Sequence, residues 1–382
     1  MIVRQLYSTL AGTVLVAALL LAGPRVGAME TAAKQAFIVD FQTGAVLLEK
    51  NADEPIHPAS MSKLMTLYLL FERLKEGRIS LDDTFPVSEK AWALNEGSTM
   101  FVGIDTQIRV EDLIRGIVVQ SGNDACIVVA EGLAGSEEAF AELMNERARE
   151  MGLTGSRFVN SHGLEDPNHK MTARDLATLA KRLIVDFPEY YHYFAEKEFV
   201  FNGIKQGNRN PLLYRNIGAD GLKTGHLSVS GYGIAASAER DGRRIILVAH
   251  GMDGMQSRAD EATNLIEWAF REFDNYRLVK AGDVLEEAPV WYGQAETVPL
   301  TVAGDLLVTL PRNARDRLRA KAVFDGPIPA PIAAGQEIGK LVISAPDVPD
   351  TEVPLVAGVA VERLGAFGRI MAAVTHLLGG GA

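Results

Sequence analysis

The chain has 382 residues, which is long enough for two domains with separate hydrophobic cores. Its 47% hydrophobic and 23% charged residues are typical of a globular protein and exclude a disordered or collagen-like chain. The formal net charge is -11 and no basic block stands out, so a nucleic-acid partner is not expected.

The first 28 residues have the features of an export signal. A cation at Arg4 precedes a short apolar stretch from Leu10 to Ala22, and small residues at 26–28 offer a cleavage site. We therefore expect residues 1–28 to be a signal peptide; an uncleaved anchor is the alternative, but the apolar stretch is short for a span. The single cysteine, Cys126, excludes an intramolecular disulfide, and its apolar surroundings predict a buried thiol.

A β-hairpin followed by a helix is predicted at the start of the mature chain. Residues 36–49 alternate apolar and polar side chains, and apolar spacing then predicts a helix over residues 60–76 with Ser60 in its first turn. Residues three apart share a helix face, so Lys63 is expected beside Ser60, where a lysine of lowered pKa can remove the hydroxyl proton. Ser-x-x-Lys alone is a weak signal, because most such tetrapeptides are a helix cap followed by an exposed lysine.

An interrupted helix follows. Residues 110–120 have helical spacing, Ser121-Gly122-Asn123-Asp124 breaks it, and residues 125–131 resume it. The break lies between two apolar helices, so its polar groups need partners: either Ser121 and Asn123 cap the second helix, or they face a cleft. Taken alone, the pattern favours capping. Further helices are expected over residues 88–95, 136–151 and 172–186, with Ser88 and Thr172 as caps.

The later part of this region predicts the remaining strands of a sheet. Short strands are expected near 199–202, an edge strand at Gly221-Leu222-Lys223-Thr224-Gly225-His226, and a hairpin over 231–250, followed by a helix over 260–273. Strands at both ends flank the helices. We therefore expect an α+β domain over residues 29–275, in which an antiparallel sheet is assembled from both chain ends and a helical part is inserted.

Composition changes after Asn275. Short alternating strands separated by glycine and proline predict a small all-β domain over residues 276–354. Residues 355–382 place apolar side chains every three or four positions, which predicts an amphipathic helix. Charges interrupt this stripe, so attachment along a membrane surface fits better than a membrane span; docking on protein is the alternative.

Three short motifs occur in order along the chain: Ser-x-x-Lys at Ser60, Ser-Gly-Asn at Ser121 and Lys-Thr-Gly at Lys223. In their expected contexts of helix start, interhelical loop and edge strand, the set resembles the penicillin-binding proteins and serine β-lactamases. The phrases at 120–126, 162–164, 201–206 and 220–226 carry a closer resemblance to the serine-type D-alanyl-D-alanine carboxypeptidases, the low-molecular-mass penicillin-binding proteins. Residues 227–230 depart from that pattern, which leaves the fine substrate preference open.

The resemblance implies a penicillin-binding-protein/β-lactamase-like transpeptidase domain, then a small all-β domain and an amphipathic C-terminal helix. It implies that Ser60 attacks the penultimate D-Ala carbonyl, that Lys63 is the base, and that Ser121 relays a proton to the leaving amine. Lys223 would lower the pKa of Lys63 and help bind the substrate carboxylate, and the backbone N–H groups of Ser60 and His226 would hold the oxyanion. The substrate-binding residues implied are Asn123, Lys223, Thr224, Gly225 and His226, with Arg209 and Arg258 as further candidates.

Peptidoglycan stem peptides are the implied substrates, and β-lactam antibiotics are the implied covalent inhibitors. The implied location is the periplasm, with peripheral attachment to the inner membrane surface through the C-terminal helix. No cofactor is implied, and the seven histidines include no His-Glu-x-x-His or comparable cluster, so a catalytic metal is not expected.

Three other functions remain open. A serine β-lactamase needs a carboxylate to activate water, and Glu165 with Asn168 offers one, although we expect Glu165 to be a surface acid. A catalytically inactive envelope scaffold and an endopeptidase of the same fold are the other two. His162 is expected to be structural.

Overall fold

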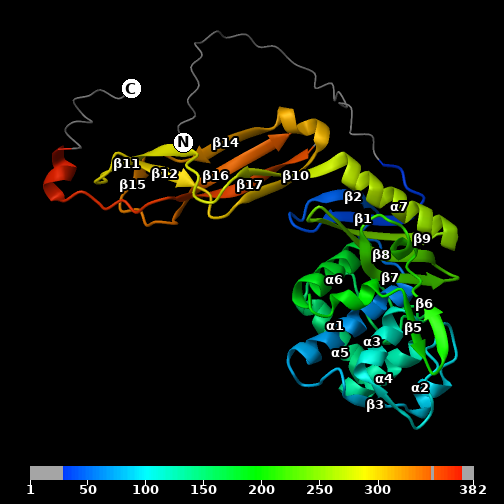
Figure 1. Cartoon of the computed structure of the whole chain (residues 1–382). Helices are drawn as coiled ribbons and strands as arrows, with labels where there is room; N and C mark the ends of the chain where they lie inside the picture. Colours follow the sequence, from blue (N-terminus) through cyan, green and yellow to red (C-terminus); the bar gives the residue numbers. More distant parts are fainter. Residues whose placement is uncertain (1–28, 346–347, 372–382) are drawn as a thin grey trace. The chain divides into compact units, whose positions relative to one another are not determined.

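The computed structural model describes residues 29–345 and 348–371; for residues 345, 348 and 349 it describes the backbone only. The predicted signal peptide and the last part of the predicted terminal helix, residues 372–382, lie outside the described residues. The chain forms one compact unit over Met29–Glu272 and another that begins at Phe273 (Figure 1). The sequence placed this boundary at Asn275.

A five-stranded antiparallel sheet lies in the first unit, in the order β2-β1-β9-β8-β7. Strand β1 pairs with β9 from Gln35↔His250 to Asp40↔Ile245, so both ends of the unit meet in one sheet, as predicted. Strand β7 lies at the edge, which confirms the predicted context of the Lys-Thr-Gly motif. The strands are β1 (Gln35–Asp40), β2 (Val46–Lys50), β7 (Ala219–Leu227), β8 (Gly231–Arg240) and β9 (Arg243–Met252).

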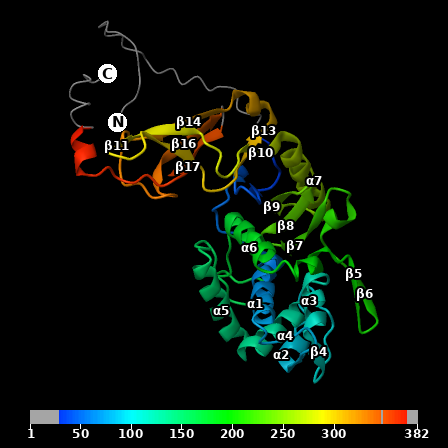
Figure 2. The same cartoon turned by 60° about the vertical axis from the view of Figure 1, so that its left-hand side comes forward.

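Helices cover both faces of this sheet. Helix α7 (Met255–Glu272) packs on one face and α6 (Ala173–Asp186) on the other, and both contact β9 (Figures 1 and 2). Helix α7 begins five residues before the predicted start at Asp260. The inserted helical part holds α1 (Lys63–Lys75), α2 (Glu89–Ala93), α3 (Val110–Val118), α4 (Asn123–Ala134) and α5 (Glu137–Glu150).

Short elements complete the unit. They are the pair β3 (Thr84–Pro86) and β4 (Gln107–Arg109), the hairpin of β5 (Glu198–Phe201) and β6 (Ile204–Gly207), and the 3-10 turns η1 (Ala59–Ser62), η2 (Tyr191–Ala195) and η3 (Pro211–Tyr214). The caps predicted at Ser88 and Thr172 are confirmed, because their side chains accept the backbone N–H groups of Ala91 and Asp175.

The structure corrects one local prediction around the motifs and decides between two alternatives left open for another. Ser60 lies in the 3-10 turn η1, and α1 begins only at Lys63, because Ala59 has a positive φ of 52° and the turn closes with a Met61 N–H to Pro58 carbonyl bond of 3.2 Å. The N-cap residue of α4 is Gly122, so no side chain caps this helix. The Asn123 side chain is instead engaged by Lys63.

The second unit is all-β, as predicted. Six strands form a sheet in the order β14-β16-β17-β12-β11-β15, and β10 pairs with β13. The strands are β10 (Phe273–Val279), β11 (Glu286–Trp291), β12 (Thr297–Thr301), β13 (Leu306–Pro311), β14 (Arg319–Phe324), β15 (Ile328–Pro329), β16 (Glu337–Ala345) and β17 (Val348–Ala357), with η4 (Arg312–Arg317) after β13. The sequence analysis did not predict β10, β14, β15 or β17.

The start of the predicted amphipathic helix is not helical. Strand β17 continues to Ala357, and isolated bridges join Val361 to Ile332 and Arg363 to Gly293. Pairing with the sheet therefore replaces helix up to this point, and helical backbone begins only at residue 366. Within residues 29–345 and 348–371, no helix has the length and apolar character needed to cross a bilayer.

Candidate active site

The turn that carries Ser60 is enclosed by two glycines from distant parts of the chain. A Cβ on Gly225 of β7 would lie 2.6 Å from the Pro58 carbonyl oxygen. A Cβ on Gly163 would lie 2.1 Å from the Ala59 carbonyl oxygen, and Gly163 has a φ of +83°. Both backbones approach η1 this closely because neither residue has a side chain. The predicted edge-strand motif and the loop after α5 therefore meet at Ser60.

Lys63 joins the first two motifs. Its Nζ lies 2.8 Å from Ser60 Oγ and 2.6 Å from Asn123 Oδ1. The third partner is the backbone carbonyl of His162, at 2.5 Å. Lys63 has no exposed surface, so these three groups provide the polar environment of its ammonium.

Burial lowers the pKa of Lys63 to about 8, and the positive charge of Arg209 acts in the same direction. The thiol of Cys126 nearby supplies no compensating negative charge at neutral pH, because burial raises its pKa to about 12. The prediction of a buried Cys126 is thus confirmed. A lysine with this pKa has a substantial neutral fraction near neutral pH and can accept the proton of Ser60.

Lys223 brings the third motif close to the other two. It is 2% exposed, and burial together with the charge of Lys63 holds its pKa well below the usual range. Its Nζ lies 3.5 Å from the carbonyl oxygen of Thr224. Thr224 is also a buried residue. Lys223 was expected to lower the pKa of Lys63; burial and then the charge of Arg209 are what lower it, and the contribution of Lys223 stays a prediction.

The Ser121-Gly122-Asn123-Asp124 segment also fixes a second loop at the site. Asn123 Nδ2 donates to the Glu96 carbonyl at 2.9 Å, so its Oδ1 faces Lys63. The Asp124 carboxylate accepts the N–H groups of Met100 at 2.9 Å and Val102 at 3.1 Å. Ser121 is 1% exposed and has a φ of 59°, a conformation that is uncommon for serine and is frequent at functional sites.

Two arginines lie near an aromatic pair formed by residues of β7 and β8. Arg209 donates to the hydroxyl of Ser98, and Arg258 Nη2 lies 3.4 Å from the Arg209 carbonyl oxygen. The exposed His226 ring stacks on the ring of Tyr232, with centroids 3.9 Å apart. The Arg258 guanidinium lies 5.6 Å from the centroid of the Tyr232 ring. The structure therefore groups Arg209, Arg258 and His226, which the sequence could only name separately.

The sequence analysis missed Asp124, Tyr232 and Ser98 as parts of this site. Tyr232 was detectable in principle, because register counted across the turn at 227–231 pairs it with His226. The loop contacts of Asp124 and Ser98 join segments distant in sequence and leave no local pattern. Glu165 is exposed, as predicted.

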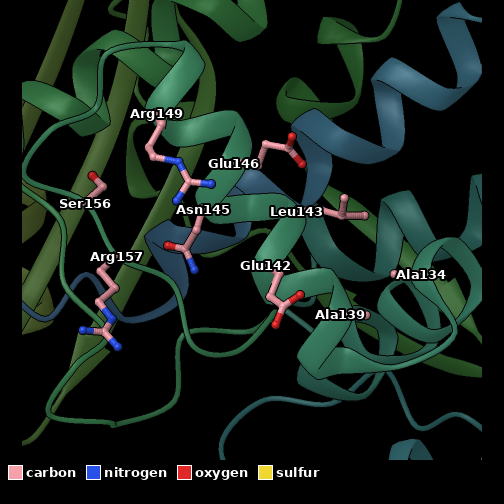
Figure 3. A pocket seen from close by; sticks show the side chains of 9 residues that line it. All are labelled: Ala134, Ala139, Glu142, Leu143, Asn145, Glu146, Arg149, Ser156 and Arg157. Carbon is pink, nitrogen blue, oxygen red and sulfur yellow. The ribbon is translucent and has the colours of Figure 1, made fainter.

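A surface cavity of about 900 Å³ lies elsewhere, along α5 and the loop that follows it (Figure 3). Its lining includes Glu142, Glu146, Arg149 and Arg157 but none of the predicted site residues. The chemistry predicted from the three motifs is therefore not associated with this cavity.

The chain matches two protein-family models. The model for D-alanyl-D-alanine carboxypeptidase covers residues 23–254, and the model for the C-terminal domain of penicillin-binding protein 5 covers residues 273–363. The chain belongs to the serine D-alanyl-D-alanine carboxypeptidase family. The motif-based prediction of the family is thereby confirmed.

Individual relatives agree with this family. The carboxypeptidase is 39% identical to the D-alanyl-D-alanine carboxypeptidase DacC of Escherichia coli over 87% of its own length and 85% of that protein. The solved structure of penicillin binding protein 5 from Haemophilus influenzae aligns with a TM-score of 0.80 and 37% identity, covering 88% of this chain and 99% of that one. The ampicillin-bound penicillin-binding protein D2 of Listeria monocytogenes aligns with a TM-score of 0.58 and 28% identity, over 63% of this chain and 98% of that one.

Proposed function

We propose that this carboxypeptidase removes the terminal D-Ala from peptidoglycan pentapeptides through an acyl-enzyme on Ser60, and so acts in cell-wall maturation and cell shape. The observation that carries the residue assignment is the buried Lys63, whose Nζ lies 2.8 Å from Ser60 Oγ and whose pKa is lowered to about 8 by burial. A base of this pKa within hydrogen-bond distance is what a serine nucleophile requires.

In the first half-reaction, neutral Lys63 takes the Ser60 proton while Oγ bonds to the carbonyl carbon of the penultimate D-Ala. The backbone N–H groups of Ser60 and His226 would hold the oxyanion. The carbon–nitrogen bond then breaks, and the terminal D-Ala leaves as an amine that takes its proton through Ser121. Water hydrolyses the ester and releases the shortened peptide and free Ser60.

Substrate binding is assigned to the edge strand and its neighbours. Asn123 would hold the substrate amide beside Lys63. The terminal carboxylate would lie near Lys223, Thr224 and His226, with Arg209 and Arg258 adding positive charge. A bound carboxylate favours the protonated form of a buried lysine, so substrate would raise the pKa of Lys223 and keep that residue cationic.

β-Lactams would acylate the same serine. The Listeria relative has been solved in its ampicillin-bound and cefotaxime-bound forms. Peptide mass spectrometry of this chain after exposure to a penicillin tests the assignment. We expect one penicilloyl adduct, on the peptide that contains Ser60, and none in Ser60→Ala. An adduct on another residue in the wild-type chain would refute the assignment of Ser60 as the nucleophile.

We also propose that the chain is exported to the periplasm and attached to the inner membrane surface through its C-terminal end. The apolar stripe of the sequence and the exposure of Phe367, Ile370 and Met371 support attachment. Flotation with vesicles of anionic phospholipid tests it: the full chain should float, and a chain ending at residue 363 should not. Equal flotation of both would contradict attachment by the tail.

A further inference from the structure

The loop that supplies the third partner of Lys63 is held by a carboxylate outside the three motifs. Glu137 is the first residue of α5 and is 7% exposed. Its Oε1 accepts the backbone N–H of Ser161 at 3.0 Å and the Ser161 hydroxyl at 2.7 Å. The same oxygen lies 3.2 Å from Nε2 of His162. One carboxylate oxygen therefore engages two consecutive residues of the loop.

The ring of His162 adds to this arrangement. Its Nδ1 accepts the N–H of Leu164 at 3.1 Å, so Nε2 carries the proton that points to Glu137. Burial lowers the pKa of His162 to about 4, so the ring is neutral at neutral pH. Burial opposes the ionisation of Glu137, but the adjacent His162 ring and the Ser161 donors outweigh it and lower the pKa of the carboxyl.

The loop is held from its other side by the helix that carries Lys63. Thr66 Oγ1 donates to the Ser161 carbonyl at 2.6 Å. The adjoining Gly163 packs directly against the Ala59 carbonyl in the Ser60 turn. Between these two contacts, the carbonyl of His162 accepts Lys63 Nζ at 2.5 Å. A shift of the loop therefore moves one of the three groups that orient the base.

We propose that Glu137 is a positioning residue for acylation: by holding Ser161 and His162, it fixes the carbonyl that orients Lys63 toward Ser60. This inference rests on the proposed roles of Ser60 and Lys63. Glu137 touches neither Ser60 nor Lys63 in any interaction of the described residues. Its effect is expected on the rate and pH dependence of acylation, through the position of the loop.

The neighbouring Glu138 provides a matched control. Lys90 Nζ lies 3.0 Å from a carboxylate oxygen of each of the two glutamates. Glu138 is exposed, and Lys90 is its ion-pair partner, whereas Glu137 alone reaches the loop. Replacing Glu138 thus changes the local charge equally but leaves Ser161 and His162 held.

The test measures second-order acylation of the full chain by a fluorescent penicillin, from pH 5 to pH 10. We expect Glu137→Ala to slow acylation by about 10- to 100-fold, because a small displacement of a catalytic group has a large effect on rate. The acid-limb midpoint should also move to lower pH, because an ammonium that loses a carbonyl acceptor is deprotonated more easily. Glu137→Gln keeps an acceptor for Ser161 and should retain most of the rate, and Glu138→Ala should match wild type.

Wild-type rate and midpoint in Glu137→Ala would overturn the proposal. A slower rate with an unchanged midpoint would overturn it too, because a purely structural defect lowers the amount of competent enzyme without changing Lys63. If melting curves show that Glu137→Ala does not fold, Thr66→Val is the deciding variant and must show the same slower rate and lower midpoint. Ser60→Ala is measured in parallel: acylation of that variant would refute the proposed function itself.

Discussion

An ammonium group without exposed surface must be stabilised by nearby polar groups or lose its proton. Lys63 shows both effects: three oxygen atoms lie within hydrogen-bond distance of Nζ, and burial lowers its pKa to about 8. Two of these oxygens come from residues 60 and 99 positions away from Lys63 along the chain. The spacing of Ser60 and Lys63 predicted their proximity, but the partners that tune the base depend on the tertiary fold.

The pH dependence of acylation follows from this pKa. Lys63 acts as a base only when neutral, so the acylation rate should fall about tenfold per pH unit below about 8 and level off above it. Lys63→Arg should abolish the reaction, because arginine stays protonated. Stopped-flow acylation by a penicillin measures the profile. A flat rate between pH 6 and pH 9 would show that Lys63 is not the base.

At the scale of elements, the sequence predicted most helices and their caps, because Ser88 and Thr172 act through contacts three residues away. It did not predict the 3-10 turn at Ser60, which depends on the close approach of β7 and the loop at Gly163. Nor did it predict the role of Glu137, whose position at the start of α5 looks like an ordinary first-turn acid. Features set by local sequence patterns were predicted, whereas features set by contacts between distant segments were not.

Gly163→Ala tests how tightly the loop docks on the Ser60 turn. The added Cβ would lie 2.1 Å from the Ala59 carbonyl oxygen at a φ of +83°. We expect a loss of more than about 1 kcal/mol in the free energy of unfolding, with slower acylation. Gly203→Ala is the matched control, because Gly203 has a φ of +75° with nothing within 4 Å of a Cβ. Equal losses in both variants would attribute the effect to backbone conformation alone.

At the scale of the whole molecule, the three motifs and their order along the chain are enough to predict the family. The two compact units and the edge position of β7 agree with the α+β and all-β architecture predicted. Strand β17 was missed, and its end was assigned to a helix, because the apolar spacing at 355–365 suits a helix as well as a strand that pairs with a sheet. Periodicity alone does not distinguish these when pairing partners are distant in sequence.

Three buried histidines of the first unit predict acid sensitivity. Burial lowers the pKa of His162 and His250 to about 4 and of His169 to about 3. Below the ordinary value of 6.5, the unfolded chain therefore binds more protons than the folded one. The contribution of these neutral histidines to the free energy of unfolding is therefore fully present above pH 6.5 and is lost as the pH falls toward 4.

Urea unfolding at pH 7 and pH 5 measures this dependence. Each histidine contributes a slope of up to about 1.4 kcal/mol per pH unit in this window. His169→Gln should therefore flatten the pH dependence, while the same change at the exposed His192 should not. If the free energy of unfolding of His169→Gln depends on pH as steeply as that of wild type, His169 is not a source of the acid sensitivity.

The most direct test of the central claim is the release of D-alanine from a peptide ending in D-Ala-D-Ala, measured beside penicillin hydrolysis for wild type and Ser60→Ala. The account predicts rapid D-alanine release and slow penicillin turnover in wild type, with both lost in Ser60→Ala. Fast penicillin hydrolysis without D-alanine release would indicate a β-lactamase and assign the water-activating role to Glu165. D-alanine release that survives in Ser60→Ala would contradict the acyl-enzyme on Ser60.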